Sequence, residues 1–442
     1  MNDKRQKSEL SRRGFLRVSG ILTAGAVLAA CTPAMAPSAG GTEAGQEVTN
    51  IRLIAWGNPT EVEAREKTLE MFHTDHPEIH VEFLHTPDQY LDKLQTMLAG
   101  GDVPDVIFLG NGDVPSFATR NQLAEFDSLI ARDSFDTSDI FPTNLALYNV
   151  DGVQYGFPVD APSQQLFYNK TRFEEAGIPV PSSDWEDPSW DWPTFLAAAT
   201  ALTDKENNLW GWQTKAGNFR AWWIWVTANG GTFFNEDGTE CLLNSDGAIE
   251  AFQFLGDLIH VHEVSPPVDV AAEMGSGELF EGGVTAMETW WPAMGRMRTN
   301  IQDFEWDVAP HPAGVAGKSC SGGGTGHTIA KASKEIDASW EFVKWVVSTP
   351  AVEEWTRIMG IVPPLKSVAV SDAFLQPGQP PEHISVFTDG APYLKPDPQH
   401  PLFPQARTIA DSELEYLWTG EKNAEEVANS MVEKINELLA EG

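Results

Sequence analysis

Segments with the pattern of β-strands alternate with segments of helical pattern between residues 50 and 109, and this alternation limits the possible folds more than any other feature. Residues 50–56 and 79–83 alternate apolar and polar side chains and are rich in β-branched residues, which is typical of strands. Residues 105–109 form a short apolar run typical of a buried strand, and residues 61–73 and 90–98 have helical patterns. The alternation predicts an α/β protein in which helices cover a mixed or parallel sheet.

The predicted strands end in residues that are suited to ligand binding. Ligands of such sheets bind beyond the carboxyl ends of the strands. Trp56 and Asn58 follow the first predicted strand, and Asn111 and Asp113 follow the third. We therefore expect these four residues in a binding site, although Asp113 also fits the N-cap of a following helix, and Thr60 is expected to cap the helix after the first strand.

The rest of the chain is long enough for a second domain of similar construction. At about 150 residues per domain, 442 residues allow two domains with some to spare. Residues 165–169 and 210–213 have strand patterns, and 194–202 and 246–260 have helical patterns. The sequence also holds sixteen Trp but only six Tyr. Trp suits stacking on the rings of a ligand, and packing in the core is the alternative for each one.

The first residues have the features of an export signal. Arg12 and Arg13 precede an apolar run at 18–30, which is the twin-arginine pattern. The run is too short for a membrane-spanning helix, which needs about eighteen residues or more. It ends at Cys31 in a sequence that resembles a bacterial lipobox, in which the cysteine receives a lipid; cleavage near Ala36 is the alternative. We expect residues 1–30 to be a signal peptide and residues 31–47 to be a flexible tether rich in Pro, Ala, Gly and Ser.

The charge of the chain excludes several classes of partner. The formal net charge is −35, and it becomes −39 from Cys31 onward, because the first thirty residues hold six basic and two acidic residues. Nucleic-acid binding depends largely on Lys and Arg that neutralise phosphates, so no nucleic-acid partner is expected. Adsorption of the domain to an anionic membrane surface is excluded for the same reason.

Neither the cysteines nor the histidines indicate catalysis or metal binding. Apart from Cys31 the chain has Cys241 and Cys320, for which a disulfide and two buried free thiols are both open. Clustered histidines near residue 76 are separated by Pro77, which breaks the helix that would align them, so no metal site is expected. No cofactor motif is present, and no catalytic residue is predicted.

A set of segments in fixed order resembles the family 1 extracellular solute-binding proteins of ATP-binding cassette importers, of the sugar and maltose type. The resemblance covers essentially residues 48–442. The segments that carry it are Trp56, 100–106 (GGDVPDV), 155–158 (YGFP), 167–170 (FYNK), 280–287 (FEGGVTAM), 306–310 (WDVAP), 330–334 (AKASK) and 338–345 (ASWEFVKW).

The resemblance implies a two-lobed periplasmic-binding-protein-like fold whose lobes close on a ligand about a hinge. One lobe is expected to comprise 48–158 and 304–348, and the other 159–303 and 349–442, with crossings near Pro158 and Ser348. It further implies a monomeric, non-enzymatic binding subunit that is lipid-anchored outside the cytoplasm. Such a subunit would capture a mono- or oligosaccharide and deliver it to transmembrane permease subunits.

A neutral sugar needs aromatic plates for its C–H faces and polar groups for its hydroxyls. The residues expected in the site are Trp56, Asn58, Asn111, Asp113, Asp160, Arg220, Trp222, Trp223, Trp290, Trp291, Gly323, Gly324 and Phe403, with Arg407 as a weaker candidate. One of Trp222 and Trp223 is expected to face the ligand, and which of Trp290 and Trp291 stacks is open.

Two alternatives remain. The same fold could bind a non-sugar solute such as glycerol phosphate, a polyamine or a peptide. The second alternative is a secreted glycoside hydrolase or lyase. Glycoside hydrolysis needs two carboxyl groups at a defined separation, and the sequence does not give the separation of its many acidic residues.

Overall fold

The computed structural model describes residues 48–161, 163–273, 278–292 and 294–441. Residues 47–442 form one compact unit. The predicted signal peptide, the tether and Cys31 lie outside the described residues. Across the described ranges, no helix is both long enough and apolar enough to cross a lipid bilayer.

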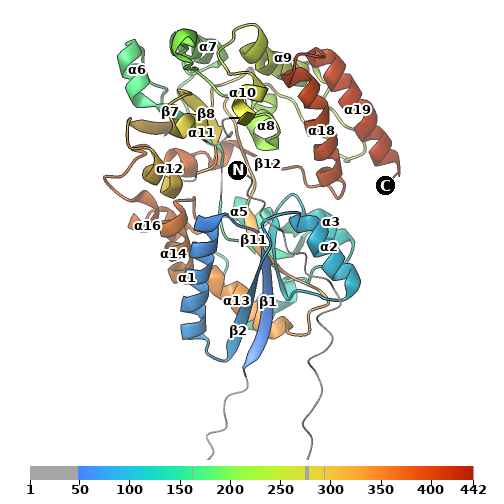
Figure 1. Cartoon of the computed structure of the whole chain (residues 1–442). Helices are drawn as coiled ribbons and strands as arrows, with labels where there is room; N and C mark the ends of the chain where they lie inside the picture. The colour runs from blue at the N-terminus through green and yellow to red at the C-terminus, as the bar shows by residue number, and fades with distance from the viewer. Residues whose placement is uncertain (1–47, 162, 274–277, 293, 442) are drawn as a thin grey trace, which may run out of the picture. The chain divides into compact units, whose positions relative to one another are not determined.

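The alternating segments at the start of the described chain form a five-stranded sheet (Figure 1). Its strands, in spatial order, are β2 (Ile79–His85), β1 (Thr49–Ala55), β3 (Val106–Gly110), β11 (Thr325–Ile329) and β6 (Gly156–Pro158). β1 pairs in parallel with both β2 and β3, whereas β11 runs antiparallel to β3 and to β6. The predicted α/β class is confirmed, and the antiparallel strand arrives from much later in the sequence.

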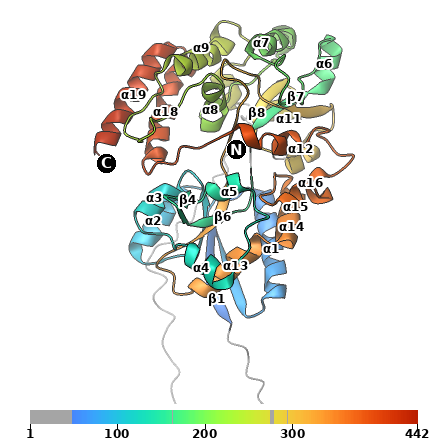
Figure 2. The ribbon, with the colours of Figure 1, turned by 180° about the vertical axis from the view of Figure 1, so that it is seen from behind.

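Helices cover both faces of this first sheet, as Figures 1 and 2 show. They are α1 (Pro59–Asp75), α2 (Tyr90–Gly100), α3 (Val114–Thr119), α4 (Asp127–Asp133), α5 (Pro142–Ala146), α13 (Ile336–Val346), α14 (Thr349–Met359) and α15 (Lys366–Ala369), with a small hairpin of β4 (Asn149–Val150) and β5 (Val153–Gln154). The short helix α16 (Asp372–Leu375) contacts α14, but its Phe374 packs in the core of the second sheet. Phe72 of α1 and Phe342 of α13 pack in the core on one face, and Leu94 of α2 and Phe117 of α3 pack on the other.

Asn58, not the expected Thr60, caps α1. The Asn58 side chain accepts hydrogen bonds from the N–H groups of Thr60 and Glu61, and the Glu61 carboxylate accepts one from the Asn58 N–H at 2.6 Å. This capping box satisfies free donors of the first turn, and Pro59 fits the first helical position because its missing N–H would have no partner there.

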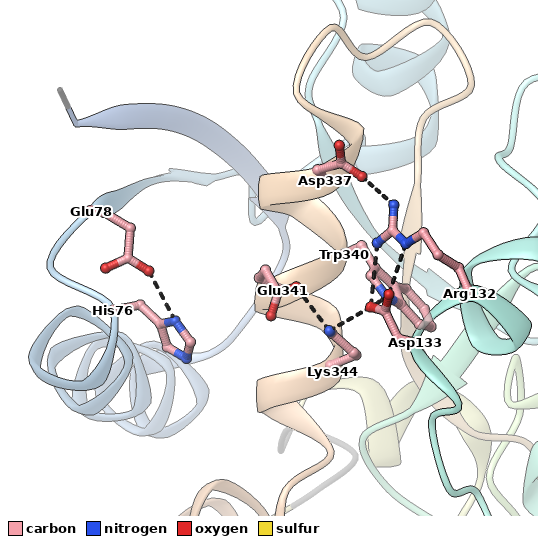
Figure 3. Close-up of polar contacts among 8 residues, drawn as sticks. All are labelled: His76, Glu78, Arg132, Asp133, Asp337, Trp340, Glu341 and Lys344. Atoms are coloured by element: carbon pink, nitrogen blue, oxygen red, sulfur yellow. Dashed lines mark hydrogen bonds and ion pairs between the residues drawn. The ribbon is translucent and has the colours of Figure 1, made fainter.

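A polar network joins α4 to α13 at the edge of the first sheet (Figure 3). The Asp133 carboxylate accepts hydrogen bonds from Arg132 Nε at 2.8 Å, Lys344 Nζ at 2.7 Å and Trp340 Nε1 at 2.8 Å. Arg132 also donates to Asp337 at 2.5 Å. The hydrogen bonds from Arg132, Lys344 and Trp340 hold the pKa of Asp133 well below its usual range. The network orients α13 over the core that lies beneath Trp340.

A second, three-stranded antiparallel sheet has the order β8 (Met287–Trp290), β7 (Gln165–Asn169) and β9 (Trp306–Ala309). A parallel pair of β10 (Cys320–Gly322) and β12 (Leu394–Pro396) lies apart from it. The helices around the second sheet are α6 (Lys170–Ala176), α7 (Trp192–Ala201), α8 (Phe219–Ala228), α9 (Asp246–His260), α10 (Val268–Glu273), α11 (Glu278–Glu281), α12 (Met294–Asn300), α17 (Val386–Asp389), α18 (Phe403–Trp418) and α19 (Ala424–Glu441), with 3₁₀ turns η1 (Lys205–Asn207) and η2 (Ala391–Tyr393).

Most of the tryptophans are structural. Eleven of the sixteen are buried, and the core of the second sheet is dense in aromatic rings: Trp212 and Trp225 pack edge-to-face with ring centroids 5.7 Å apart, and Phe195 contacts both. Such rings bury a large apolar area each and dominate the energy of a core. Residues 210–213, expected to be a strand, form only isolated bridges at Trp210 and Gln213.

The lobe boundaries expected from the resemblance do not coincide with the strands and cores. β9 was placed in the first lobe, but it completes the second sheet because its backbone groups pair with β7. α14 was placed in the second lobe, but Ala351 and Val352 bury its apolar face in the core of the first sheet, against α1. The chain does pass from β6 of the first sheet to β7 of the second after Pro158.

Of the two alternatives left open for Cys241 and Cys320, the structure shows two buried free thiols. Burial raises the pKa of Cys241 to about 11 and that of Cys320 to about 12, so both stay protonated and unreactive.

Candidate functional site

A cavity of about 470 Å³ lies between the carboxyl ends of the first sheet and the end of β8 in the second. Both sheets therefore contribute to it. Its lining residues are Trp56, Asn58, Thr60, Glu61, Gly110, Gly112, Asp113, Asp160, Arg220, Trp290, Trp291, Pro292, Arg296, Gly324, Thr325, Trp355, Met359, Ile361, Asp397 and Arg407. Its size is in the range of pockets that enclose small molecules.

Trp56 enters this cavity directly from the end of β1. It is half-buried, with its ring centroid 4.8 Å from that of Tyr90 and 4.6 Å from that of Phe108. The Tyr90 hydroxyl donates to the Phe108 carbonyl at 2.6 Å and lies 3.2 Å from that of Ile54, so it ties together the ends of β1 and β3. The position of Trp56 is thereby fixed by the sheet itself.

Trp290 and Trp291 line the cavity from the side of the second sheet. The Lys215 ammonium lies 3.7 Å from the centroid of the Trp290 ring and forms an ion pair with Glu288 at 2.6 Å. The Arg220 guanidinium lies at a greater distance, 5.0 Å, from the Trp291 ring. The cation therefore occupies one face of Trp290 at contact distance, which leaves Trp291 as the better plate for a ligand.

Arg220 is held by a carboxylate that the sequence analysis missed. Its Nε donates to Asp397 Oδ1 at 2.8 Å, its Nη2 donates to the other oxygen, and the Asp397 side chain is only 2% exposed. A Cβ atom at Gly323 would come within 2.2 Å of both Arg220 Nη2 and Asn111 Oδ1. Gly323 therefore makes space for the Arg220–Asp397 pair and does not line the cavity.

Two acidic residues of the cavity have raised pKa values. Burial raises the pKa of Asp160 to about 7, although its carboxylate accepts a hydrogen bond from the Thr325 N–H at 2.7 Å and another from the Thr325 hydroxyl. Burial also raises the pKa of Asp113 to about 6, against the opposing charge of Arg407. Asp113 sits at the N-cap position of α3, but its side chain makes no capping hydrogen bond.

We expect Asp160→Asn to change how stability depends on pH. The folded protein holds the Asp160 proton more tightly than the unfolded chain, whose pKa is near 3.8. The stabilising contribution is therefore present below pH 3.8 and is lost as the pH rises through about 7, by up to ~1.4 kcal/mol per pH unit. The free energy of unfolding of the variant, relative to that of the unchanged protein, should rise with pH over this range in denaturant titrations. The matched change Asp303→Asn, at an exposed position, should leave the dependence of the free energy of unfolding on pH as it is. If D160N also leaves this dependence unchanged, the raised pKa assigned to Asp160 is contradicted.

Five predicted site residues lie outside the cavity lining. Asn111 is fully buried behind it, and Gly323 is the spacer described above. Trp222 and Trp223 are both buried in the second core, and Trp222 Nε1 donates to Asp411 at 3.0 Å. Phe403 is 1% exposed against Phe219 and Phe233. For these five residues the prediction is corrected. At Trp222 and Trp223 the reason is that both faces of α8 are apolar, so its pattern does not distinguish the cavity from the core.

The structure brings together the other predicted residues, namely Trp56, Asn58, Asp113, Asp160, Arg220, Trp290, Trp291, Gly324 and the weaker candidate Arg407. It adds Glu61, Arg296, Trp355 and Asp397 as side chains that sequence reasoning missed. Only Glu61 had a local signal, because it lies three residues after Asn58 in a capping box.

One group of side chains away from this cavity has the geometry of metal ligands. Ligand atoms of Asp307, Glu382 and His383 lie within 4.8 Å of one another. Both oxygens of Asp307 already accept hydrogen bonds from His383, from its N–H at 3.0 Å and its Nδ1 at 2.6 Å. Lys170 lies 3.8 Å from Glu382. These contacts give the three residues a structural role.

Two sheets with separate cores, and a cavity lined from both with aromatic, polar and charged side chains, define a ligand-binding protein of the two-lobed class. The sequence model described as bacterial extracellular solute-binding protein matches residues 55–353. The chain belongs to this family.

Relatives and a solved structure agree with the assignment. A protein of Brucella abortus (strain 2308), named as a binding protein, is 25% identical over 85% of this chain and 89% of its own length. The arabinooligosaccharide-binding protein of Halalkalibacterium halodurans is 28% identical over 49% of each chain. The sn-glycerol-3-phosphate-binding periplasmic protein of Shigella flexneri is 26% identical over 69% of this chain and 72% of its own. The structure of an ABC substrate-binding protein of Listeria monocytogenes in complex with cycloalternan superposes with a TM-score of 0.81, at 25% identity, over 89% of this chain and 99% of that one.

Proposed function

We propose that this protein captures a neutral mono- or oligosaccharide in the cavity between its two sheets and delivers it to the permease of an ATP-binding cassette importer. The observation that carries the proposal is the composition of the cavity: Trp56 and Trp291 line it from different sheets, with carboxylates and arginines around them. Aromatic faces suit the C–H faces of a sugar ring, and short polar groups suit its hydroxyls. The ligands of the Halalkalibacterium and Listeria proteins, an arabinooligosaccharide and cycloalternan, belong to the same class.

The charges of the cavity favour a neutral ligand over a phosphate ester. Arg220, Arg296 and Arg407 line the cavity and could attract an anion. However, Arg220 is paired with Asp397 and Arg296 with Glu281. Besides Asp397, the carboxyl groups of Glu61, Asp113 and Asp160 line the cavity, which opposes a dianion. Glycerol phosphate, the ligand class of the Shigella relative, is therefore the second candidate.

The lining of the cavity by residues of both sheets supports closure about the crossing after Pro158, because a ligand held by both sides favours the closed state. Family members of this kind are binding proteins, and this supports a non-enzymatic role. The sequence of the leader supports export by the twin-arginine route and lipid anchoring at Cys31.

A thermal-shift screen of the purified chain tests the proposal. A ligand that binds only the folded state raises the melting temperature with the logarithm of its concentration. We expect a saturable rise with at least one saccharide of the panel at concentrations where a sugar alcohol, the control for non-specific osmolyte stabilisation, has no effect.

Two other outcomes would contradict it. If glycerol 3-phosphate, a polyamine or a peptide raises the melting temperature and no sugar does, the ligand is not a saccharide. Release of shortened products from an oligosaccharide that binds would show a hydrolase.

A further inference from the structure

Arg65, on α1, is a buried cation whose hydrogen-bonding groups are only partly satisfied. The residue is 3% exposed. Its Nη1 lies 3.4 Å from Nε2 of His327 on β11, whereas Nε and Nη2 have no hydrogen-bond partner among the described residues. These two atoms form the side-on edge of the guanidinium, the fork that binds anions with two parallel hydrogen bonds.

The surroundings of Arg65 offer aromatic rings but no ion pair. The guanidinium carbon lies 4.4 Å from the centroid of Phe108 and 5.1 Å from that of Trp355. Among the described residues no carboxylate forms an ion pair with Arg65, and Glu61 and Asp160 act on its charge only through space. Burial lowers the pKa of Arg65 to about 10, so it remains charged at neutral pH. A buried charge without a partner is costly, which indicates that something compensates it.

Arg65 lines a small cavity of about 20 Å³. It has room for an occupant about the size of one water molecule. Arg65, Thr68, Val159, His327 and Trp355 are among its lining residues, and Phe342, Val346, Ala351 and Val352 close it with apolar side chains.

The polar groups that lack partners beside this cavity are hydrogen-bond donors. They are Nε and Nη2 of Arg65 and Nε1 of Trp355. Since Arg65 can only donate, His327 Nε2 must accept from it, so the proton of the ring lies on Nδ1, which is a further donor without a partner. Thr68 uses its hydroxyl proton on helix carbonyls of Ala64 and Arg65. Hydrogen-bond donors around a buried positive charge are complementary to a bound species that accepts hydrogen bonds and carries negative charge.

We propose that a small monovalent anion with the size of chloride binds in this cavity against the Nε–Nη2 edge of Arg65, as a site separate from the sugar cavity. A water molecule would fill the same space but would leave the charge of Arg65 uncompensated. Trp355 lines both cavities, so the anion also fixes one wall of the ligand site.

The experiment compares thermal unfolding of the full chain in sodium chloride, sodium bromide and sodium gluconate at equal ionic strength. Chloride and bromide should raise the melting temperature by a few degrees in a saturable manner, and gluconate, which is too large for the cavity, should not. Crystals soaked in bromide should show an anomalous peak beside Arg65. Equal melting temperatures in the three salts, together with no peak, would overturn the proposal and assign the cavity to water.

Two variants separate the geometry from the charge. Arg65→Lys keeps the charge but removes the side-on edge, and it should abolish the halide-specific shift. Arg357→Met, at an exposed arginine paired with Glu354, should keep the shift. If R65K fails to fold, the halide titration and the bromide peak of the unchanged protein still show whether an anion binds in the cavity. Retention of the full shift in a folded R65K protein would contradict the assigned edge.

Discussion

Replacing Lys215 with Met is expected to lower the free energy of unfolding by about 3–5 kcal/mol, the range observed when one partner of a buried ion pair is removed. The Lys215 ammonium lies 2.6 Å from the Glu288 carboxylate, and the two side chains are 2% and 0% exposed. Burial lowers the pKa of Lys215 and raises that of Glu288, so each charge depends on the other for its ionised form. The variant leaves Glu288 buried without that cation. Denaturant titration monitored by tryptophan fluorescence measures the loss.

A double variant and a surface pair serve as controls. Lys215→Met combined with Glu288→Leu removes both charges and should recover most of the loss, because apolar side chains of similar volume often replace a buried pair without cost. Lys170→Met removes a partly exposed cation that lies near Glu305 and Glu382 at the surface, and it should cost no more than about 1 kcal/mol. The single K215M variant should also regain stability as the pH falls and Glu288 takes up a proton. A double variant whose loss equals the sum of the two single losses would contradict the coupling.

Part of the fold could be predicted because its signals are local. The strands at Thr49–Ala55 and Ile79–His85 and the helix at Asp246–His260 are where the periodicity of the sequence predicts them. β11 and β9 could not be assigned to a sheet in this way, since both pair with strands more than a hundred residues earlier. Whether such a strand joins the first or the second sheet depends on which sheet offers it a strand with free backbone hydrogen-bonding groups. The sequence of the strand alone does not contain this information.

The candidate site was predictable where a residue lies in the turn after a strand. Trp56 directly follows β1 and Asp113 lies three residues after the end of β3, and the ends of neighbouring parallel strands meet at one edge. Asp397 and Trp355 join the same cavity from late segments, one buried against Arg220 and the other within α14, and neither has a distinctive neighbourhood in the sequence. Trp222 and Trp223 show the opposite error: an aromatic run on a helix has the same composition whether it faces a ligand or a core.

Trp291→Ala is expected to weaken binding of the saccharide identified by the screen by about 30- to 1,000-fold. Truncation of a well-placed aromatic anchor costs about 2–4 kcal/mol of binding free energy, and about 1.4 kcal/mol corresponds to a factor of ten. Trp291 lines the cavity, is half-buried and follows the last strand residue of β8, so its removal should affect the ligand more than the core. Isothermal titration calorimetry measures the affinity, and denaturant titration should show only a small change in stability.

Three further variants assign the loss to stacking on this ring. Trp291→Phe keeps a flat apolar face and should recover part of the affinity, whereas Trp210→Ala removes a half-buried tryptophan outside the cavity and should leave it unchanged. Trp290→Ala should cost less affinity than W291A, because Lys215 already lies against the Trp290 ring, but more stability, because that cation loses its contact. Since Arg220 lies 5.0 Å from the Trp291 ring, a loss in W291A that W291F does not recover at all would indicate displacement of Arg220 instead of a lost plate. Full affinity in W291A would remove Trp291 from the site and leave Trp56 and Trp290 as the candidate plates.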